Sequence, residues 1–144
     1  MKNFSEYLKE GIARKTLPDK KRASSLIENS DKRNFFFEQI INAVDITDDN
    51  ANYVIEQVYD ILIELIRAKI IFDGYYASGN YAHEAEVSYL KELNFTDFEI
   101  SMLDEIRKFR NGVKYYGKRY NKNEAESSIR FKNSVINKLK EKIR

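Results

Sequence analysis

The segment DDNANYVIEQVYDILIELIRAKIIF, residues 48–72, decides the fold of this 144-residue chain. Its apolar residues recur at helical spacing and cover more than one face of the helix that they predict. These residues are Val54, Ile55, Val58, Ile61, Leu62, Leu65, Ile66 and Ile70. A helix that is apolar on several faces has to be covered on several sides. We therefore expect it at the centre of a helical bundle, or shared with a second subunit.

Helices are also predicted before this segment, because the chain has one proline, five glycines and few alternating apolar patterns. A short helix is expected to end near Gly11, and a long one to begin near Pro18 and run through Val44. Residues 47–50 are predicted to supply the N-cap of the central helix, with acidic residues at the positive end of the helix dipole, and the helix is expected to run roughly from Asp48 to Phe72. Residues 73–80 are predicted to form a loop.

Three further helices are expected after that loop. The first contains apolar residues at positions 87, 90 and 93. Thr96 and Glu99 match a capping box that begins the second helix, and Gly117 is expected to end it. Residues 121–124 begin the last helix. These lengths predict an all-α, up-and-down antiparallel bundle of four core helices with short flanking helices, in a single domain that spans residues 1–144.

The composition excludes several classes of chemistry. The chain has no cysteine and a single histidine, His83. Disulfides, thiolate catalysis and multi-histidine metal sites are therefore excluded, and we predict no metal and no cofactor. No segment resembles a signal peptide or a membrane-spanning helix. We expect a cytoplasmic protein without a membrane partner.

The stretch DEIRKFRNGVKYYG, residues 104–117, is the most informative polar feature. An apolar stripe runs through Ile106, Phe109 and Val113, and Arg110 borders it. A guanidinium in such a place needs an acid, a phosphate or a second chain as its partner. The other interpretation is an arginine whose stem lies along apolar surface while its head stays in water.

Charge is strongly uneven along the chain. Residues 107–144 contain 13 basic and 3 acidic side chains, a net charge of +10. Residues 1–106 contain 12 basic and 20 acidic side chains, a net charge of −8, so the whole chain carries +2. Basic residues interleaved with Tyr115, Tyr116 and Tyr120 are typical of a surface that binds phosphates and stacks bases. Solvated basic helices show a similar pattern.

An arginine followed at once by a polar residue, late in the penultimate helix of such a bundle, resembles the HEPN family. These small helical domains occur beside minimal nucleotidyltransferases and in many prokaryotic toxins. The family signature is Arg, a polar residue, three further positions and then His, and Arg110 and Asn111 match its first two positions. The resemblance in layout covers about residues 1–140. It implies a homodimer in which Arg and His of the motif meet in a shared cleft. There the 2′-hydroxyl of the RNA attacks the adjacent phosphate, and the RNA is cleaved without a metal ion.

Tyr115 stands where the family has its catalytic histidine. The reaction needs a base whose pKa lies near the working pH, as that of imidazole does. A phenol ordinarily titrates near 10, so about one part in a thousand is ionised at pH 7, and closing that gap takes about 4 kcal/mol. We therefore expect catalysis by the motif positions Arg110, Asn111 and Tyr115 to be lost or reduced.

The binding half of the motif is expected to remain. The arginines and the lysine are predicted to contact phosphate, the asparagine amide to orient the ligand, and the tyrosines to stack on bases. The predicted RNA- or nucleotide-binding residues are Arg107, Arg110, Asn111, Lys114, Tyr115, Tyr116 and His83.

Several residues allow two interpretations. His83, near a predicted helix start, either packs or caps the helix or takes part in chemistry in the cleft. Tyr75 and Tyr76 either stack on bases or cover the end of the bundle. The basic runs at 14–15 and 20–22 either extend a phosphate-binding surface or belong to a solvated helix start.

Three functions are consistent with the sequence. The first is a homodimeric, HEPN-like domain that binds RNA or a nucleotide through Arg110. The second is a toxin-like, metal-independent endoribonuclease in which His83 or an activated Tyr115 supplies the base. In the third, the chain is a non-enzymatic partner of a separately encoded nucleotidyltransferase, and the resemblance implies that tyrosines beside Arg110 accept nucleotidyl groups.

Overall fold

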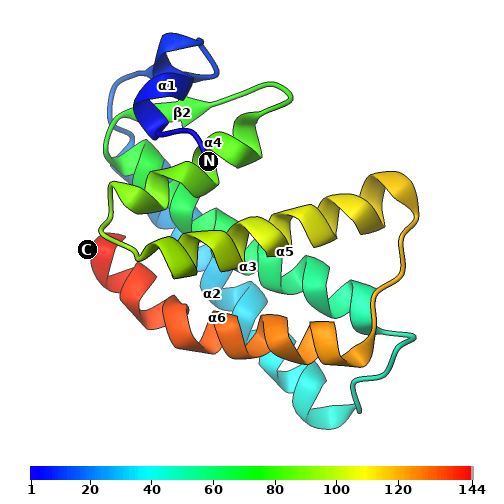
Figure 1. The fold of residues 1–144 in the computed structure, drawn as a ribbon. Coiled ribbons are helices and arrows are strands. Elements are labelled where there is room, and N and C mark those ends of the chain that lie inside the picture. The colour runs from blue at the N-terminus through cyan, green and yellow to red at the C-terminus, as the bar shows by residue number, and fades with distance from the viewer. Residues whose placement is uncertain (144) are drawn as a thin grey trace.

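The computed structural model, which describes residues 1–143, confirms the all-α prediction and places α3 (Ala51–Phe72) at the centre of a helical bundle (Figure 1). The other long helices are α2 (Lys20–Ala43), α5 (Asp97–Tyr116) and α6 (Lys122–Ile143). All three pack against α3. Most residues of α3 are buried, on every side of the helix. Because helices of the same chain cover its apolar faces, α3 is the core of a single chain rather than a helix shared by two chains.

Short elements close one end of the bundle (Figure 1). They are α1 (Phe4–Lys9), β1 (Ala13–Lys15), β2 (Tyr75–Ala77), α4 (Ala82–Ser88) and the 3₁₀ turn η1 (Tyr89–Lys91). The strands were not predicted from the sequence, because each is only three residues long. They pair antiparallel, with Arg14 opposite Tyr76. The ring of Phe4 packs edge-on against Tyr75 and Tyr89, with centroids 5.5 and 4.7 Å apart, and so fastens the N-terminal segment to β2 and η1.

The predicted segment 47–50 contains the N-cap of α3, but the helix begins three residues after the predicted start at Asp48. Asn50 is the N-cap, and its side chain accepts a hydrogen bond from the backbone N–H of Thr47 at 2.9 Å instead of capping the helix. Residues 47–50 therefore form a turn, and the helix begins at Ala51. Asp48 acts elsewhere: its carboxylate accepts the backbone N–H of Lys122 at 2.8 Å, which satisfies a free amide at the start of α6.

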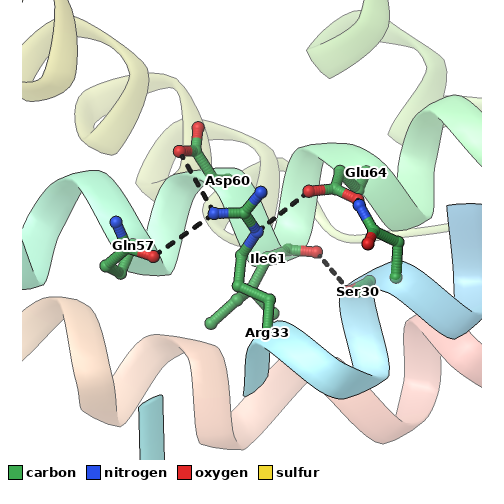
Figure 2. Close-up of polar contacts among 7 residues, drawn as sticks. Ser30, Arg33, Gln57, Asp60, Ile61 and Glu64 are labelled. Atoms are coloured by element: carbon green, nitrogen blue, oxygen red, sulfur yellow. Dashed lines mark hydrogen bonds and ion pairs between the residues drawn. The ribbon is translucent and has the colours of Figure 1, made fainter. Parts of the chain in front are cut away.

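A polar network joins α2 to α3 (Figure 2). Ser30 is buried, and its hydroxyl donates to the carbonyl oxygen of Ile61 at 2.8 Å. Arg33 donates from Nε to Glu64 at 2.9 Å and from Nη1 to Gln57 at 3.3 Å. The Glu64 side chain is 9% exposed, so its charge is stable only with these partners. The network fixes the position of α2 along α3.

No helix within residues 1–143 is both long enough and apolar enough to cross a membrane. In the same residues, His, Asp and Glu side chains do not gather in groups of three that could hold a metal ion.

Candidate functional site

Helix α5, which carries the predicted motif, is well defined at both ends. Thr96 Oγ1 accepts the backbone N–H of Glu99 at 3.1 Å, and the Glu99 carboxylate accepts that of Thr96 at 2.9 Å. This confirms the predicted capping box. Gly117 ends the helix in a left-handed conformation with φ of 62°, as glycine permits. Arg110 thus lies in the second half of a regular helix.

The chain after α5 folds back on the helix because residue 112 is a glycine. A Cβ at Gly112 would lie 2.5 Å from the hydroxyl of Tyr120, whose ring stacks on Phe109 with centroids 4.7 Å apart. Asn52 of α3 accepts the N–H of Tyr120 at 2.9 Å and donates to the carbonyl of Lys118 at 3.0 Å. The basic segment 118–119 is therefore held at the C-terminal end of the helix that carries Arg110.

Arg110 lies against α3 rather than in open water. Its side chain is half-buried, and its Cζ lies 5.7 Å from the centroid of the Tyr59 ring. Among residues 1–143 it has no acidic partner within ion-pair distance. A cation at this distance over an aromatic face is held in place by the quadrupole of the ring. The guanidinium is thus oriented by the fold but its charge is not neutralised.

Tyr59 connects Arg110 to the only histidine of the chain. The tyrosine is fully buried, and its hydroxyl lies 2.9 Å from Nδ1 of His83. The two rings also stack, with centroids 5.8 Å apart and an angle of 24° between their planes. His83 and Arg110 therefore contact the same aromatic ring, although they come from α4 and α5.

The acids around this ring are already paired with other cations. Glu86 accepts two hydrogen bonds from Arg67, at 2.6 Å from Nε and 2.9 Å from Nη2. Arg107 donates to Asp104 at 2.8 Å and lies 3.7 Å from Glu84. Arg107, one of the predicted binding residues, is thus mostly buried in an ion-pair cluster and positions α4 against α5. Its charge is balanced inside the protein, whereas that of Arg110 is not.

His83 is held in a mainly neutral form. Burial lowers its pKa below the ordinary value of 6.5, and the positive charges of Arg67, Arg110 and Arg107 lower it further. The carboxylate of Glu86 acts in the opposite direction. Burial also raises the pKa of Tyr59, so the phenol keeps its proton at neutral pH. The pair is therefore an imidazole and a phenol that share one hydrogen bond.

The remaining predicted residues lie further along α5. Asn111 is half-buried, while Lys114 is exposed. Tyr115 and Tyr116 are also exposed, with 66% and 77% of their surface accessible. The structure of one chain therefore brings Arg110 and His83 together around Tyr59. It leaves both tyrosines of the motif free on the last turn of the helix.

A cavity of about 290 Å³ adjoins His83 on the side of α2 and β2. Elements distant in sequence supply its walls: Arg22 from α2, Arg67 from α3, Tyr76 from β2, and His83 and Glu86 from α4. The side chains of Ile70 and Ile71 also line it. Tyr76 thus forms part of a cavity wall, whereas Tyr75 packs against Phe4 and Tyr89.

Sequence reasoning did not identify Tyr59 or Arg67 as part of the site. Tyr59 is the one aromatic residue among residues 54–71 of α3, and a buried hydroxyl needs a hydrogen-bond partner. Arg67 interrupts an apolar run, which indicates a buried or half-buried partner acid. Neither signal names the partner, because His83 and Glu86 lie on another helix.

No family model, no curated protein and no solved structure matches this chain.

Proposed function

We propose that this domain binds RNA, or a phosphate group of a nucleotide, at Arg110, and that cleavage by the HEPN mechanism is lost or reduced. One observation carries the proposal. Arg110 is a half-buried cation on the Tyr59 ring, and no acid among residues 1–143 balances its charge. A partly desolvated guanidinium in that state gains more from an external anion than an exposed one does.

The geometry of the contact favours phosphate over other anions. A guanidinium that lies on an aromatic face keeps the N–H groups in its plane free for other acceptors. Those groups match two oxygens of a phosphate and bind them in a bidentate manner. Lysine would provide a point charge at the same position but not this fork.

The surface around Arg110 is also suited to a strand with several phosphates. Lys114, Lys118 and Arg119 are exposed near the end of α5, and among residues 1–143 none of them is in an ion pair. Cations at a helix C-terminus are stabilised by the helix dipole, so this arrangement costs little in the free protein. Each of them adds to the attraction of a polyanion at moderate salt.

The position of His83 favours endoribonuclease activity as the second candidate. His83 and Arg110 contact the same ring, so an imidazole and a guanidinium lie together within one chain. The lowered pKa keeps the imidazole neutral at pH 7. It could take the proton from a 2′-hydroxyl only if Nδ1–H donates to Tyr59, which leaves Nε2 as the acceptor. Incubation of single-stranded RNA with the protein and a chelator tests this activity, which must then be lost in both His83→Ala and Arg110→Ala.

We also propose that the domain is a homodimer, with the last turn of α5 in the interface. The apolar faces of α3 are covered by helices of the same chain, so α3 needs no second subunit to cover it and is not evidence for a dimer. Tyr115 and Tyr116 do: two adjacent aromatic side chains with most of their surface exposed are frequent in interfaces. A two-fold contact there would bring the basic surfaces of both subunits close to one another.

The affinity of variants for a short single-stranded RNA tests the binding proposal. Arg110→Ala is expected to weaken the affinity by about tenfold, in the range typical for loss of one bidentate phosphate contact. Arg130→Ala is the matched control, because Arg130 is exposed on α6 and, among residues 1–143, also has no acidic partner. Equal affinities of both variants would contradict the proposal.

A further inference from the structure

The cavity beside His83 has a chemical character that the contact at Arg110 does not explain. Four elements, α2, α3, β2 and α4, meet around its volume of about 290 Å³. This is close to the lower end of the range for pockets that bind small molecules, about 300–1,000 Å³. It offers room for a single nucleotide-sized group rather than for a helix or a duplex.

The net charge of the cavity is positive. Arg67 and Glu86 neutralise each other through two hydrogen bonds, and burial keeps His83 mainly neutral. Arg22 remains, exposed at the wall and without an acidic partner among residues 1–143. Arg14 lies next to Tyr76 of the cavity wall, since its Nη1 donates to the hydroxyl of Tyr76 at 3.3 Å. Arg22 on the wall and Arg14 beside Tyr76 are thus both without an acidic partner among residues 1–143.

One wall of the cavity is aromatic and the inner part is apolar. Tyr76 is 38% exposed, and pairing of β1 with β2 holds it in place opposite Arg14. Ile70 and Ile71 of α3 line the cavity as well. An exposed, fixed aromatic ring beside apolar side chains suits a flat, weakly polar group such as a nucleobase. A small aliphatic acid or a bare phosphate would use the arginines but not the ring.

We propose that this cavity binds one nucleotide, with its base against Tyr76 and its phosphate at Arg22 and Arg14. The part of this inference that concerns RNA rests on the proposed function. His83 lines the cavity and contacts Tyr59, on which Arg110 lies, so the Tyr59–His83 pair connects the two binding points. We expect a strand whose phosphate binds Arg110 to place another of its nucleotides in the cavity.

His83 provides a direct probe, because it is the only histidine in the chain. Its imidazole Cε1–H signal in a proton NMR spectrum needs no assignment by mutagenesis, and it reports on the cavity wall. Titration with 5′-AMP at constant pH is expected to shift this signal in a saturable manner. Adenosine and inorganic phosphate are expected to bind about tenfold more weakly than AMP, because each lacks half of the contacts. Absence of a saturable shift with AMP would overturn the inference.

Variants on the cavity wall locate the ligand. Arg22→Ala and Tyr76→Ala are each expected to weaken AMP binding by about tenfold. Both side chains are exposed, so these substitutions leave the buried core untouched. Tyr76→Phe keeps the ring and removes the acceptor of Arg14, and it is expected to have a smaller effect than Tyr76→Ala.

Two controls match these variants in charge and exposure. Arg130→Ala removes an exposed arginine on α6. Tyr53→Ala removes a tyrosine that is 42% exposed and lies about 21 Å from Arg67 along α3. Both are expected to bind AMP as the wild type does. Equal weakening by the controls and the cavity variants would place the nucleotide elsewhere.

The two proposals fail separately. RNA affinity that depends on Arg110, without binding of AMP at His83, overturns the cavity and leaves the proposed function intact. Binding of AMP that depends on Arg22 and Tyr76, with RNA affinity independent of Arg110, overturns the proposed function. The cavity then remains a site for a free mononucleotide.

Discussion

The hydroxyl of Tyr59 lies 2.9 Å from Nδ1 of His83, and the ring of the same tyrosine lies under the guanidinium of Arg110. This one buried side chain of α3 thus positions a neutral imidazole from α4 and an unbalanced cation from α5. Tyr59 is a positioning residue. Its role gives the site a fixed geometry within a single chain.

Tyr59→Phe removes the hydroxyl while the ring remains under Arg110. His83 Nδ1 then loses its partner, but His83 is half-buried, so water can replace the bond in part. We expect a loss of about 1 kcal/mol in the free energy of unfolding, measured by urea denaturation. RNA affinity is expected to change little, because the contact of Arg110 with the ring is kept. A large fall in RNA affinity in a fully folded Tyr59→Phe protein would show that the hydroxyl itself contacts the ligand.

His83 makes stability depend on pH in a defined direction. Its pKa in the folded protein is lowered, mainly by burial, below the value of 6.5 expected in the unfolded chain. Between these two values the unfolded chain binds a proton that the folded protein does not. The free energy of unfolding therefore decreases as the pH falls through 6.5 towards the lowered pKa, and His83 contributes no pH dependence well above 6.5.

Urea denaturation of the wild type and His83→Gln measures this effect, since other groups titrate alike in both proteins. The wild type is expected to lose more stability than the variant between about pH 7.5 and about pH 5.5. Equal losses in the two proteins would contradict the lowered pKa.

A buried lysine holds α6 against α2. The side chain of Lys132 is 1% exposed, donates to Asn34 at 2.6 Å and pairs with Glu38, which is half-exposed. Lys132→Ala is expected to reduce the free energy of unfolding by about 3 kcal/mol, because it removes the packed stem and leaves polar groups without a partner. Lys132→Met keeps most of the stem and is expected to cost less.

The surface pair of Lys32 and Glu28 provides the control for that experiment. Both side chains are mostly exposed, so Lys32→Met is expected to change stability by no more than about 0.5 kcal/mol. Urea denaturation of the three variants gives the comparison. A cost for Lys132→Ala as small as that for Lys32→Met would mean that the α2–α6 contact contributes little.

Dimerisation is predicted through the exposed end of α5. Tyr116→Glu places a charge in the proposed interface and is expected to convert the dimer to a monomer. Phe98→Glu is the control, because Phe98 is an aromatic residue at the start of α5 that is 72% exposed, and this variant is expected to remain a dimer. Light scattering at micromolar concentration measures the mass of each protein. A monomeric wild type, or a dimer that persists in Tyr116→Glu, would remove α5 from the proposed interface.

The sequence predicted the long helices well because their signals are local. The apolar pattern of residues 54–70 requires a covered helix, and the capping box at Thr96 and the glycine at 117 mark both ends of α5. The start of α3 was predicted three residues too early because the side chains of Thr47 and Asn50 accept each other's backbone N–H and close a turn before the helix. The two strands were not predicted because three-residue segments with mixed side chains show no periodic pattern of apolar residues.

The site was predicted only in part, since its connections cross between helices. Arg110 stood out through its place beside an apolar stripe, and His83 through being the only imidazole. Their common contact, Tyr59, looks like an ordinary core residue in the sequence. The ion pair of Arg107 with Asp104 could have been predicted from the sequence, because the two residues are three positions apart on one helix. The pairing of Arg67 with Glu86 depends on how α4 packs on α3 and has no local signal.

The salt dependence of RNA affinity tests the central claim most directly, because it counts the phosphates that the protein neutralises. Fluorescence anisotropy with a labelled single-stranded RNA measures the affinity at about 50 to 200 mM salt. The slope of log affinity against log salt concentration is compared among the wild type, Arg110→Ala and Arg130→Ala. If Arg110 binds a phosphate, its replacement lowers the steepness of that slope by about 0.7 and weakens affinity at every salt concentration, while Arg130→Ala stays close to the wild type. A slope and an affinity that are the same in Arg110→Ala and in the wild type would contradict the account.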